Sequence, residues 1–508
     1  MDCRVALAER VEESLADGGP WPVPEGWAWV PLKRLSSFIG RGRGPTYVDS
    51  NGVPVVNQKC IRWRRLEAKH FKQTARSAFV RLAPELHLQA GDLLWNSTGT
   101  GTIGRALVYD GSFPELTIDS HVTLVRPVSV LPAYLGYFIE TTRVQRLVVD
   151  SHVGSTNQRE LPRSFVEDLL IPLPPLAEQR RIVARIDALF AEIAEGEAAL
   201  VAARDGLDTF RRALLKAAVT GELTKDWRAA NPVSETGQDF LTRIIQNIGE
   251  GAVPKGRSRR AKEPAAIDHS NLPRLPASWA WTRLSTLGEF GRGKSRHRPR
   301  DDARLYGGEM PFVQTGIVAN SDDYIRTYQQ TYSAVGVEQS RVWPPGTLCI
   351  TIAANIAKTA ITTFECCFPD SIVGLTPVRK IDPYWVHIWM KTIQQRLERY
   401  APATAQKNIN LEVLDAVMVP IPPPAEAAEI LRRVSDAISA SADVQALLEA
   451  EAADAARLKQ SILKAAFEGR LVPQDSTEEP AAALLERLAT TGPAPARAKR
   501  GRGARSHA

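Results

Sequence analysis

Apolar residues recur at alternating spacings of four and three in two long stretches of the chain, and charged residues fill most positions between them. This heptad pattern is typical of the buried seam of a coiled coil. The first stretch carries the candidate seam residues Ile182, Ile186, Leu189, Ile193, Leu200, Leu207, Phe210 and Leu214. The second stretch carries Ile430, Val434, Val444, Leu448, Leu458 and Ile462. A helix of about 45 residues forms a rod of roughly 65 Å.

Proline and glycine mark the two ends of each predicted helix. Pro174-Pro175 and Pro422–Pro424 precede the helices, where the fixed φ of proline suits a first turn. Gly221 and Gly469 follow them, where a left-handed stop belongs. A long helix surrounded by solvent is the alternative interpretation. Because both predicted helices have the same heptad period and lie in one chain, they favour pairing with each other. Short connections between tandem units favour an antiparallel pair with a pseudo-twofold axis.

The chain repeats itself. Ile171–Pro175 recurs as Val419–Pro423 and Leu214–Leu223 recurs as Ile462–Leu471, both at an offset of 248. A Trp-Ala-Trp sequence near the start of each unit repeats at 252. The later part of each unit is therefore constant in length, whereas the earlier part tolerates small insertions, as loops do.

Short β-type runs separated by Gly, Pro and Asn fill the earlier part of each unit. In the first unit they include Asp92–Asn96, Ala106–Tyr109 and Val122–Val125, and this pattern predicts a strand-rich domain. Aromatic-rich helices are expected over Pro132–Thr142 and Pro383–Arg399. The predicted fold class is α+β, with two strand-rich α/β domains separated by two long antiparallel coiled-coil helices in a tandem repeat.

Composition adds few constraints on function. The net charge is only +7 over 508 residues, and the five cysteines form no Cys-x-x-Cys or Cys/His cluster with zinc spacing. No apolar run is long enough for a membrane span, and the N-terminus does not resemble a signal peptide. We therefore expect a cytoplasmic protein with no disulfides, no metal site and no membrane contact.

Two enzyme-like motifs occur, and neither has the right context. Gly288–Ser295 satisfies the Walker A pattern, but a charged loop with a proline follows it instead of a helix. Gly99–Gly104 satisfies the dinucleotide fingerprint, but a strand follows it, so a glycine hairpin between two strands is the better interpretation. No adenine-methyltransferase loop and no His-Glu-x-x-His is present. We predict no catalytic residue and no cofactor for this chain; a nucleotide-using enzyme built on Gly288–Ser295 stays as an alternative.

Basic residues concentrate in the segments Arg41–Arg76 and Arg292–Arg304, one in each repeat. Such segments are typical of surfaces that neutralise phosphates, while Asn, Gln, Arg and Lys in loops can read base edges. A solvated charged face is the alternative for each segment. The candidate DNA-binding residues are Arg41, Arg43, Lys59, Arg62, Arg64, Asn96, Thr98, Thr100, Gln158, Arg159, Arg292, Lys294, Arg296, Arg298, Gln314, Lys358, Gln406 and Lys407.

Taken in order, these features resemble the specificity subunit of a type I restriction–modification enzyme. The similarity covers Trp21 to about Leu488 and occurs in both units. It rests on the Trp-x-Trp openings, the Gly-rich basic loops, the Leu-Lys-Ala-Ala-x-x-Gly stops and five further segments: Gly91–Leu94, Pro345–Leu348, Ser155–Gln158, Thr404–Ile409 and Ile171–Ile182. The second unit departs slightly, with Ala425–Ala428 in place of Ala177–Arg180 and a seam interrupted at Ser441.

The resemblance implies that two target-recognition domains each read one half of a bipartite, asymmetric double-stranded DNA site. It implies that the helices fix the unread spacer and dock two methyltransferase subunits, and that motor-nuclease restriction subunits join for cleavage. S-adenosylmethionine, ATP and magnesium would belong to those partners, with no cofactor in this chain. A self-sufficient sequence-specific DNA-binding or antirestriction scaffold with no methyltransferase partner is the alternative.

The expected domain limits follow from the repeat and the resemblance together. They are a first recognition domain, a first spacer helix, a short helix with a basic linker, a second recognition domain, a second spacer helix, and a short helix with a basic tail. In that order these segments cover residues 1–175, 176–223, 224–270, 271–424, 425–471 and 472–508.

Overall fold

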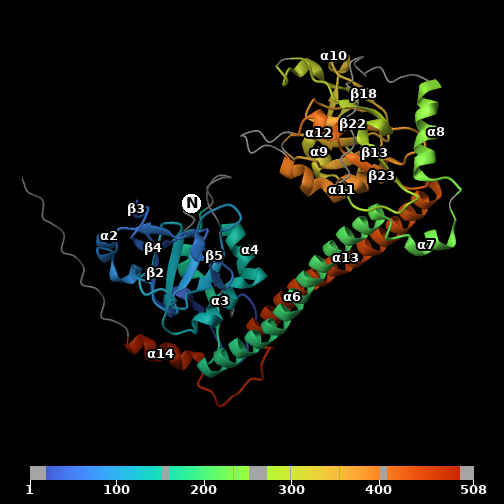
Figure 1. Ribbon diagram of the computed structural model, residues 1–508. Helices are drawn as coiled ribbons and strands as arrows, with labels where there is room; N and C mark the ends of the chain where they lie inside the picture. The colour runs from blue at the N-terminus through green and yellow to red at the C-terminus, as the bar shows by residue number, and fades with distance from the viewer. Residues whose placement is uncertain are drawn as a thin grey trace, which may run out of the picture. The chain divides into compact units, whose positions relative to one another are not determined.

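The chain divides into two compact units in the computed structural model (Figure 1). Unit 1 comprises residues 1–200 and 450–508, and unit 2 comprises residues 201–449. Each unit contains one strand-rich domain and part of each long helix, α6 (Leu176–Thr220) and α13 (Pro424–Phe467). The structure describes residues 19–151, 160–232, 234–250, 272–297, 299–353, 355–400 and 409–491.

Unit 1 is built on two four-stranded sheets, ordered β2-β11-β8-β9 and β10-β4-β7-β3. The first sheet is antiparallel, and in the second β10 runs parallel to β4. The central strand β8 is buried at all four positions, which explains its continuous apolar run. The strands are β1 (Ala28–Pro31), β2 (Ser36–Arg41), β3 (Tyr47–Val48), β4 (Val53–Val56), β5 (Ile61–Arg62), β6 (Arg65–Leu66), β7 (Lys72–Thr74), β8 (Leu93–Asn96), β9 (Ala106–Val108), β10 (Thr117–Ile118), β11 (Val122–Pro127) and β12 (Leu170–Leu173).

Unit 1 also contains short helices, of which α3 and α5 pack against the first sheet. The α-helices are α2 (Arg76–Val80), α3 (Pro132–Glu140), α4 (Thr142–Ser151), α5 (Arg163–Asp168) and α14 (Ala481–Thr491). Three 3-10 turns lie between strands, at Leu32–Leu35, Ala68–His70 and Pro84–Leu86. The strands expected at Asp92–Asn96, Ala106–Tyr109 and Val122–Val125 and the helix expected at Pro132–Thr142 are confirmed to within two residues.

Unit 2 repeats this plan, with β14-β22-β19-β20-β16 as one sheet and β17-β15-β21-β18 as the other. Its strands are β13 (Ala280–Arg283), β14 (Gly288–Arg292), β15 (Tyr306–Phe312), β16 (Tyr324–Ile325), β17 (Gln330–Tyr332), β18 (Val342–Trp343), β19 (Leu348–Thr351), β20 (Thr359–Thr362), β21 (Cys366–Cys367), β22 (Ile372–Pro377) and β23 (Met418–Ile421). Its helices are α7 (Lys225–Ala230), α8 (Gly237–Glu250), α9 (Thr315–Asn320), α10 (Ala334–Glu338), α11 (Pro383–Tyr400) and α12 (Leu411–Asp415), with 3-10 turns at Leu284–Leu287 and Ala303–Leu305.

A two-stranded closure ties the start of each strand-rich domain to its end. β1 pairs antiparallel with β12, so that Ala28 lies opposite Leu173. β13 pairs with β23 in the same way, so that Ala280 lies opposite Ile421. In both units the Trp-x-Trp opening is therefore held beside the strand that leads into the long helix, although the intervening chain differs in length between the units.

Both long helices end where glycine was expected to stop them. Gly221 has φ +77° and Gly469 has φ +70°, a left-handed conformation that glycine adopts without steric cost. The amide of Leu223 then donates to the carbonyl of Ala217 at 3.0 Å. The backward hydrogen bond satisfies a carbonyl that the ended helix leaves open.

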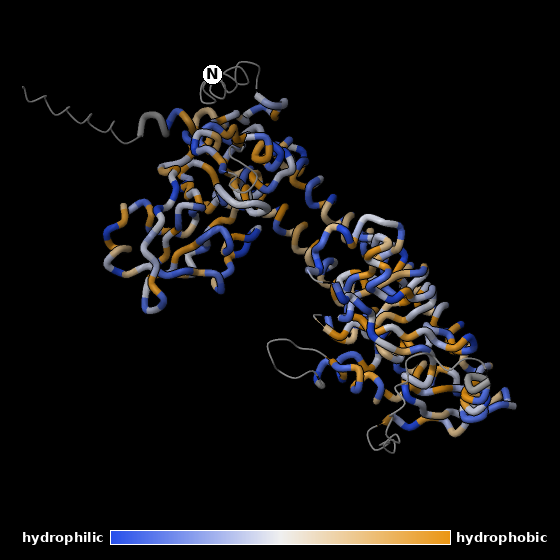
Figure 2. Tube along the Cα trace, turned by 90° about the horizontal axis from the view of Figure 1, so that it is seen from above, coloured by the Kyte–Doolittle hydropathy of each residue, from blue (hydrophilic) through white to orange (hydrophobic). Residues whose placement is uncertain are grey.

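Within each unit the two long helices run antiparallel, as predicted. In unit 1 the Lys459 ammonium contacts the Glu197 carboxylate at 2.7 Å, while Arg181 of α6 pairs with Glu478, beyond the end of α13. In unit 2 the Arg211 guanidinium donates to the Ser441 hydroxyl at 2.9 Å. Hydrophobic and hydrophilic residues alternate along both helices (Figure 2).

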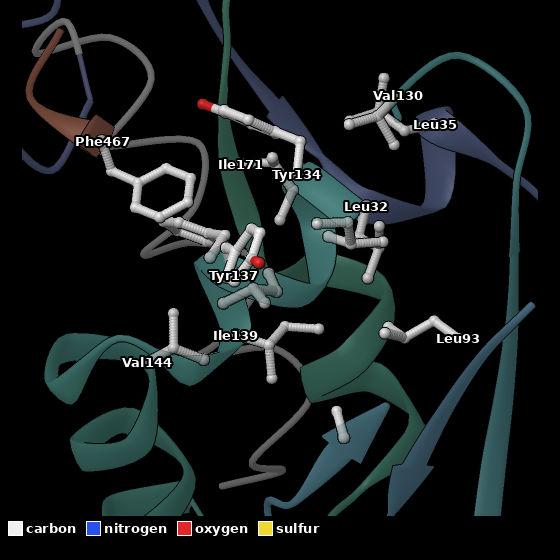
Figure 3. Close-up of a cluster of buried hydrophobic side chains, with 14 of the residues drawn as sticks. Leu32, Leu35, Leu93, Val130, Tyr134, Tyr137, Ile139, Val144, Ile171 and Phe467 are labelled. Atoms are coloured by element: carbon white, nitrogen blue, oxygen red, sulfur yellow. The ribbon is translucent and has the colours of Figure 1, made fainter. Parts of the chain in front are cut away.

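The end of α13 completes the core of unit 1. Phe467 is 2% exposed, and its ring lies 5.0 Å from that of Tyr134 and 5.1 Å from that of Phe138, both on α3 (Figure 3). Ile462 and Leu463 join the same cluster, together with Ile182 and other residues of α6. A segment from the end of the chain is thus part of the first domain's core.

Unit 2 is completed in the corresponding way by the end of α6. Ala218 and Val219 are buried in the cluster that also contains Trp279 and Trp385, whose rings lie 5.7 Å apart. Phe240 and further apolar residues of α8 cover the same cluster. Each strand-rich domain is therefore packed against the end of the helix that belongs to the other repeat in sequence.

Burial along the predicted seam is strongest near the domains. Ile182, Ile186, Ile430 and Val434 are fully buried, and Leu214 and Ile462 are 8% exposed. The intervening Leu189, Ile193, Leu200, Leu207 and Leu448 are partly buried. Phe210, Val444 and Leu458 were expected in the seam but are 48%, 45% and 51% exposed. A helix with 3.6 residues per turn drifts away from a seven-residue repeat, so residues in a strict heptad row do not all face the partner helix.

Candidate nucleic-acid interface

An Arg-Gly-basic turn occurs at the same place in both strand-rich domains. In unit 1 it is Arg41–Arg43, at the end of β2, and in unit 2 it is Arg292–Lys294, at the end of β14. A Cβ on Gly42 would lie 2.3 Å from the Ile118 carbonyl oxygen, and one on Gly293 would lie 2.2 Å from that of Phe368. Only glycine allows this close approach.

The residues flanking these glycines are placed differently. Arg43 and Lys294 are exposed, as is Arg292, and no ion pair within the described part of the chain occupies their side chains. Arg41 instead turns inward, since its guanidinium pairs with the Glu160 carboxylate and donates to the Leu161 carbonyl at 2.5 Å. We therefore assign Arg41 a structural role and retain the other three as phosphate-binding candidates.

The segment after β4 in unit 1 presents further basic side chains. Lys59 is exposed, whereas Arg62 donates to the carbonyls of Lys59 and Ile61 and pairs with Glu67 at 3.1 Å. Arg64 faces α6, with its guanidinium 4.7 Å from the Phe190 ring centroid. Arg64 thus connects the domain to the long helix, and Lys59 is exposed without an ion pair to any described residue.

The glycine loop Gly99–Gly104 joins β8 to β9 as an antiparallel hairpin connection, which confirms the hairpin interpretation. Asn96 precedes the loop and is fully buried. Its amide donates to the carbonyls of Gln58 at 3.0 Å and Thr102 at 3.3 Å. The prediction that Asn96 reads bases is wrong, because the end of β8 points this side chain into the domain.

The hydroxyls of the same loop remain at or near the surface. Thr98 hydrogen-bonds His121 at 2.7 Å and is partly buried, whereas Thr100 is exposed. In unit 2, Arg296 and Lys358 are exposed. Gln314 is also exposed, and its amide donates to Gln330 at 2.7 Å. Candidates outside the described residues are Gln158, Arg159, Arg298, Gln406 and Lys407.

Sequence patterns missed a buried network in unit 2. His387, fully buried, bonds Asp323 at 2.9 Å through Nε2 and Thr359 at 3.0 Å through Nδ1, and Lys391 donates to the same carboxylate at 2.5 Å. Burial lowers the pKa of His387. Although burial of Asp323 opposes its ionisation, bonds from His387 and Lys391 bring its pKa well below the ordinary value.

The network joins Thr, His and Asp in the order of an acyl-transfer triad, but Thr359 is 6% exposed and His387 is inaccessible. A nucleophile must reach its substrate, so the geometry supports anchoring of α11 on β20. The residues were hidden from sequence analysis because they lie far apart in the chain and match no motif.

The Walker-like segment Gly288–Ser295 is the strand β14 followed by the basic turn of unit 2, and the next helical element among the described residues is the short turn at Ala303–Leu305. A phosphate-cradling loop needs a helix directly after it, so the geometry does not form a nucleotide site. Among the described residues no cluster of His, Cys, Asp and Glu could hold a metal ion, and no described helix is long and apolar enough to cross a membrane.

Comparison with known proteins explains the duplicated geometry. The family described as "Type I restriction modification DNA specificity domain" matches residues 47–202 and 277–450. The chain belongs to this family. Each match covers most of one strand-rich domain and the start of the long helix that follows it.

Curated relatives of the specificity subunit align over most of its length. The chain is 23% identical to the EcoKI specificity subunit of Escherichia coli K12, covering 92% of this chain and 95% of the relative. It is 25% identical to the EcoBI specificity subunit of E. coli, covering 70% and 69% respectively. A chain solved in work on complex assembly and conformational transition of the type I R-M system has 21% identity and a TM-score of 0.61, covering 89% of this specificity subunit and all of that chain. This likeness shows the same fold.

Membership defines the role of the chain in general terms. A specificity subunit recognises DNA within a type I restriction–modification complex and is not the catalytic component. The two strand-rich domains are its target-recognition domains, and the exposed basic turns lie on them.

Proposed function

We propose that this specificity subunit reads a bipartite, asymmetric sequence in double-stranded DNA, one half with each recognition domain. The matched basic turns are the single observation that carries the proposal. Arg43 in unit 1 and Lys294 in unit 2 follow corresponding glycines and expose positive charge. Phosphate contacts of this kind position a reader on the duplex, and side chains beside them specify bases.

The two half-sites should differ in sequence. The two domains share a strand order but differ at the edges of their sheets. The edge strand β3 of the first domain has no counterpart in the second, and β16 and β18 of the second domain have none in the first. We propose that side chains from both domains contact the bases. They are Lys59, Thr98 and Thr100 in unit 1 and Arg296, Gln314 and Lys358 in unit 2. Gln and Lys in these positions suit adenine and guanine edges respectively.

The helices are proposed to dock two methyltransferase subunits, with motor-nuclease subunits joining for cleavage. Exposed apolar side chains support a docking role, since Val201, Phe210, Val444 and Leu447 on the unit 2 parts of α6 and α13 are 45% to 65% exposed. A protein partner would cover these apolar side chains. S-adenosylmethionine, ATP and magnesium would be bound by those partner subunits.

We also propose functional segments that follow the structure. Residues 1–175 and 271–424 hold the recognition domains, 176–223 and 425–471 hold the spacer helices, and 224–270 and 472–508 each hold a short helix, α8 or α14, followed by a basic stretch. The basic stretches 253–262 and 497–505 lie outside the described residues.

Sequencing of methylated DNA tests the function. The chain is co-expressed with a type I methyltransferase subunit, and the methylated motif is determined. Exchanging residues 19–175 for the same domain of a relative should change one half of the motif and leave the other unchanged. A chain that binds one continuous site without methyltransferase would contradict the proposal and favour a self-sufficient scaffold.

A further inference from the structure

Three arginines and a tryptophan line a surface pocket on the first recognition domain. The pocket has a volume of about 540 Å³ and is bounded by Arg62, Trp63, Arg65 and Arg105. The β5–β6 hairpin supplies the first three of these side chains, and the residue before β9 supplies Arg105. Trp63 is partly buried and packs against the domain core with one part of its surface.

The turn of this hairpin is anchored by contacts of Arg64 with α3 and α6. Arg64 has φ +58°, a conformation that costs a non-glycine residue energy and persists only where the surroundings enforce it. Its guanidinium lies over the Phe190 ring and donates to the Glu140 carboxylate at 3.2 Å. Arg64 thus faces α6, and its neighbours Arg62, Trp63 and Arg65 line the pocket.

Arg105 is positioned by the glycine loop. Gly104 has φ +88°, and a Cβ there would lie 2.8 Å from the Gln145 side-chain oxygen. The Gln145 amide donates to the Gly104 carbonyl at 3.2 Å, and the Arg105 carbonyl accepts from the Asn96 amide at 2.8 Å. The loop that resembles a dinucleotide fingerprint therefore serves to aim Arg105.

The pocket carries more positive charge than its own acids neutralise. Arg65 and Arg62 share the Glu67 carboxylate, at 2.6 Å and 3.1 Å. No carboxylate among the described residues pairs with the side chain of Arg105, although it is partly buried. An unpaired cation held in a partly desolvated place favours binding of an anion.

We infer that this pocket binds one phosphodiester of the DNA backbone, with the adjoining sugar against the Trp63 ring. Planar guanidinium groups match phosphate oxygens bidentately, and an aromatic ring offers the sugar an apolar contact that does not depend on the base sequence. An acidic protein surface would pair with the same arginines, but the DNA-recognition role of this family favours the phosphodiester. The inference rests on the proposed function. It adds a contact that holds the DNA backbone on the first recognition domain whatever the base sequence.

The test measures the salt dependence of DNA binding by the complex of this chain with its methyltransferase. The probes are a duplex carrying the methylated motif and a duplex of scrambled sequence. The variants are Arg105→Ala, Arg65→Ala and Arg105→Lys. Arg81→Ala is the matched control, because Arg81 is exposed on the same unit and donates to the Ser77 carbonyl. Thermal unfolding checks that each variant is folded.

Each alanine variant in the pocket should weaken binding of both duplexes by a similar factor of about ten and reduce the slope of log K against log salt by about 1. Arg105→Lys should restore the slope, and the methylated motif should stay unchanged. Slopes equal to those of Arg81→Ala would overturn the inference, as would weaker methyltransferase assembly with an unchanged slope. Failure of the wild-type complex to prefer its motif would instead contradict the proposed function.

Discussion

The indole N–H of Trp27 donates to the buried carboxylate of Glu178 at 2.9 Å, and the second unit repeats this bond between Trp279 and Glu426, also at 2.9 Å. The tryptophan opens a recognition domain and the glutamate lies in the first turn of a long helix. A negative charge near a helix N-terminus is favourable, yet burial raises the pKa of Glu178. The bond therefore fixes the entry of the domain against the start of its helix.

Trp27→Phe should lower the free energy of unfolding by about 1–3 kcal/mol, because a buried carboxylate loses one donor. Glu178 would keep the Gln474 amide, which donates at 2.6 Å. Urea unfolding of the whole chain measures the loss. Trp29→Phe is the control, since that indole donates at 3.2 Å to the uncharged carbonyl of Trp21. Equal losses in the two variants would contradict a special role for Trp27.

Phe467→Ala should destabilise unit 1 selectively, by about 3–5 kcal/mol, because it leaves a cavity between rings of α3. Hydrogen exchange should show faster opening of the first domain and unchanged protection in the second. Leu458→Ala is the matched control on the same helix, since Leu458 is 51% exposed and its loss should cost less than about 0.5 kcal/mol. Loss of protection in unit 2 alone would contradict the assignment of this segment to the first core.

Acid should weaken the attachment of α7 to α13. Hydrogen bonds from Arg433, at 2.8 and 3.0 Å, lower the pKa of Asp226 from 3.8 to about 2. A carboxyl whose folded pKa lies below its unfolded pKa adds stability above the unfolded value, and this stability is lost as the pH falls through the folded value. Wild type should therefore be more stable than Asp226→Asn above pH 4, and the difference should shrink between about pH 4 and pH 2.

Unfolding of both proteins across this pH range measures the effect. Asp208→Asn is the control, because this exposed aspartate of α6 makes no ion pair with any described residue. A difference between wild type and Asp226→Asn that stays constant down to pH 2 would contradict the ion-pair explanation.

The two arginines on either side of Gly42 should respond differently to alanine. Arg43→Ala should weaken DNA binding by about tenfold, the effect of losing one charge-assisted hydrogen bond, without changing the melting temperature. Arg41→Ala should lower the melting temperature, since Arg41 bonds Glu160 and the Leu161 carbonyl. Paired measurements of DNA affinity and melting temperature for each variant check this. An intact affinity in Arg43→Ala would remove it from the interface.

Local patterns predicted the secondary structure well. The strands β8, β9 and β11 and the helices α3 and α11 lie within two residues of their expected bounds, because turn residues mark their ends. Individual site residues were harder to predict. Asn96 and Thr100 are both polar and near one loop, yet one is fully buried and the other is exposed. The direction of a strand's last side chain depends on the sheet around it.

The sequence by itself determined the duplicated plan, the two long helices with their glycine stops, and the family. Periodicity, turn residues and a constant offset are local or pairwise properties that need no coordinates. Only the tertiary structure decided which domain each helix end completes. Leu214–Leu223 and Ile462–Leu471 are so alike that either could cover either domain. The packing of Phe467 on Tyr134 assigns the second segment to the first domain. The sequence could not decide this, because a contact between residues far apart in the chain leaves no mark in a local pattern.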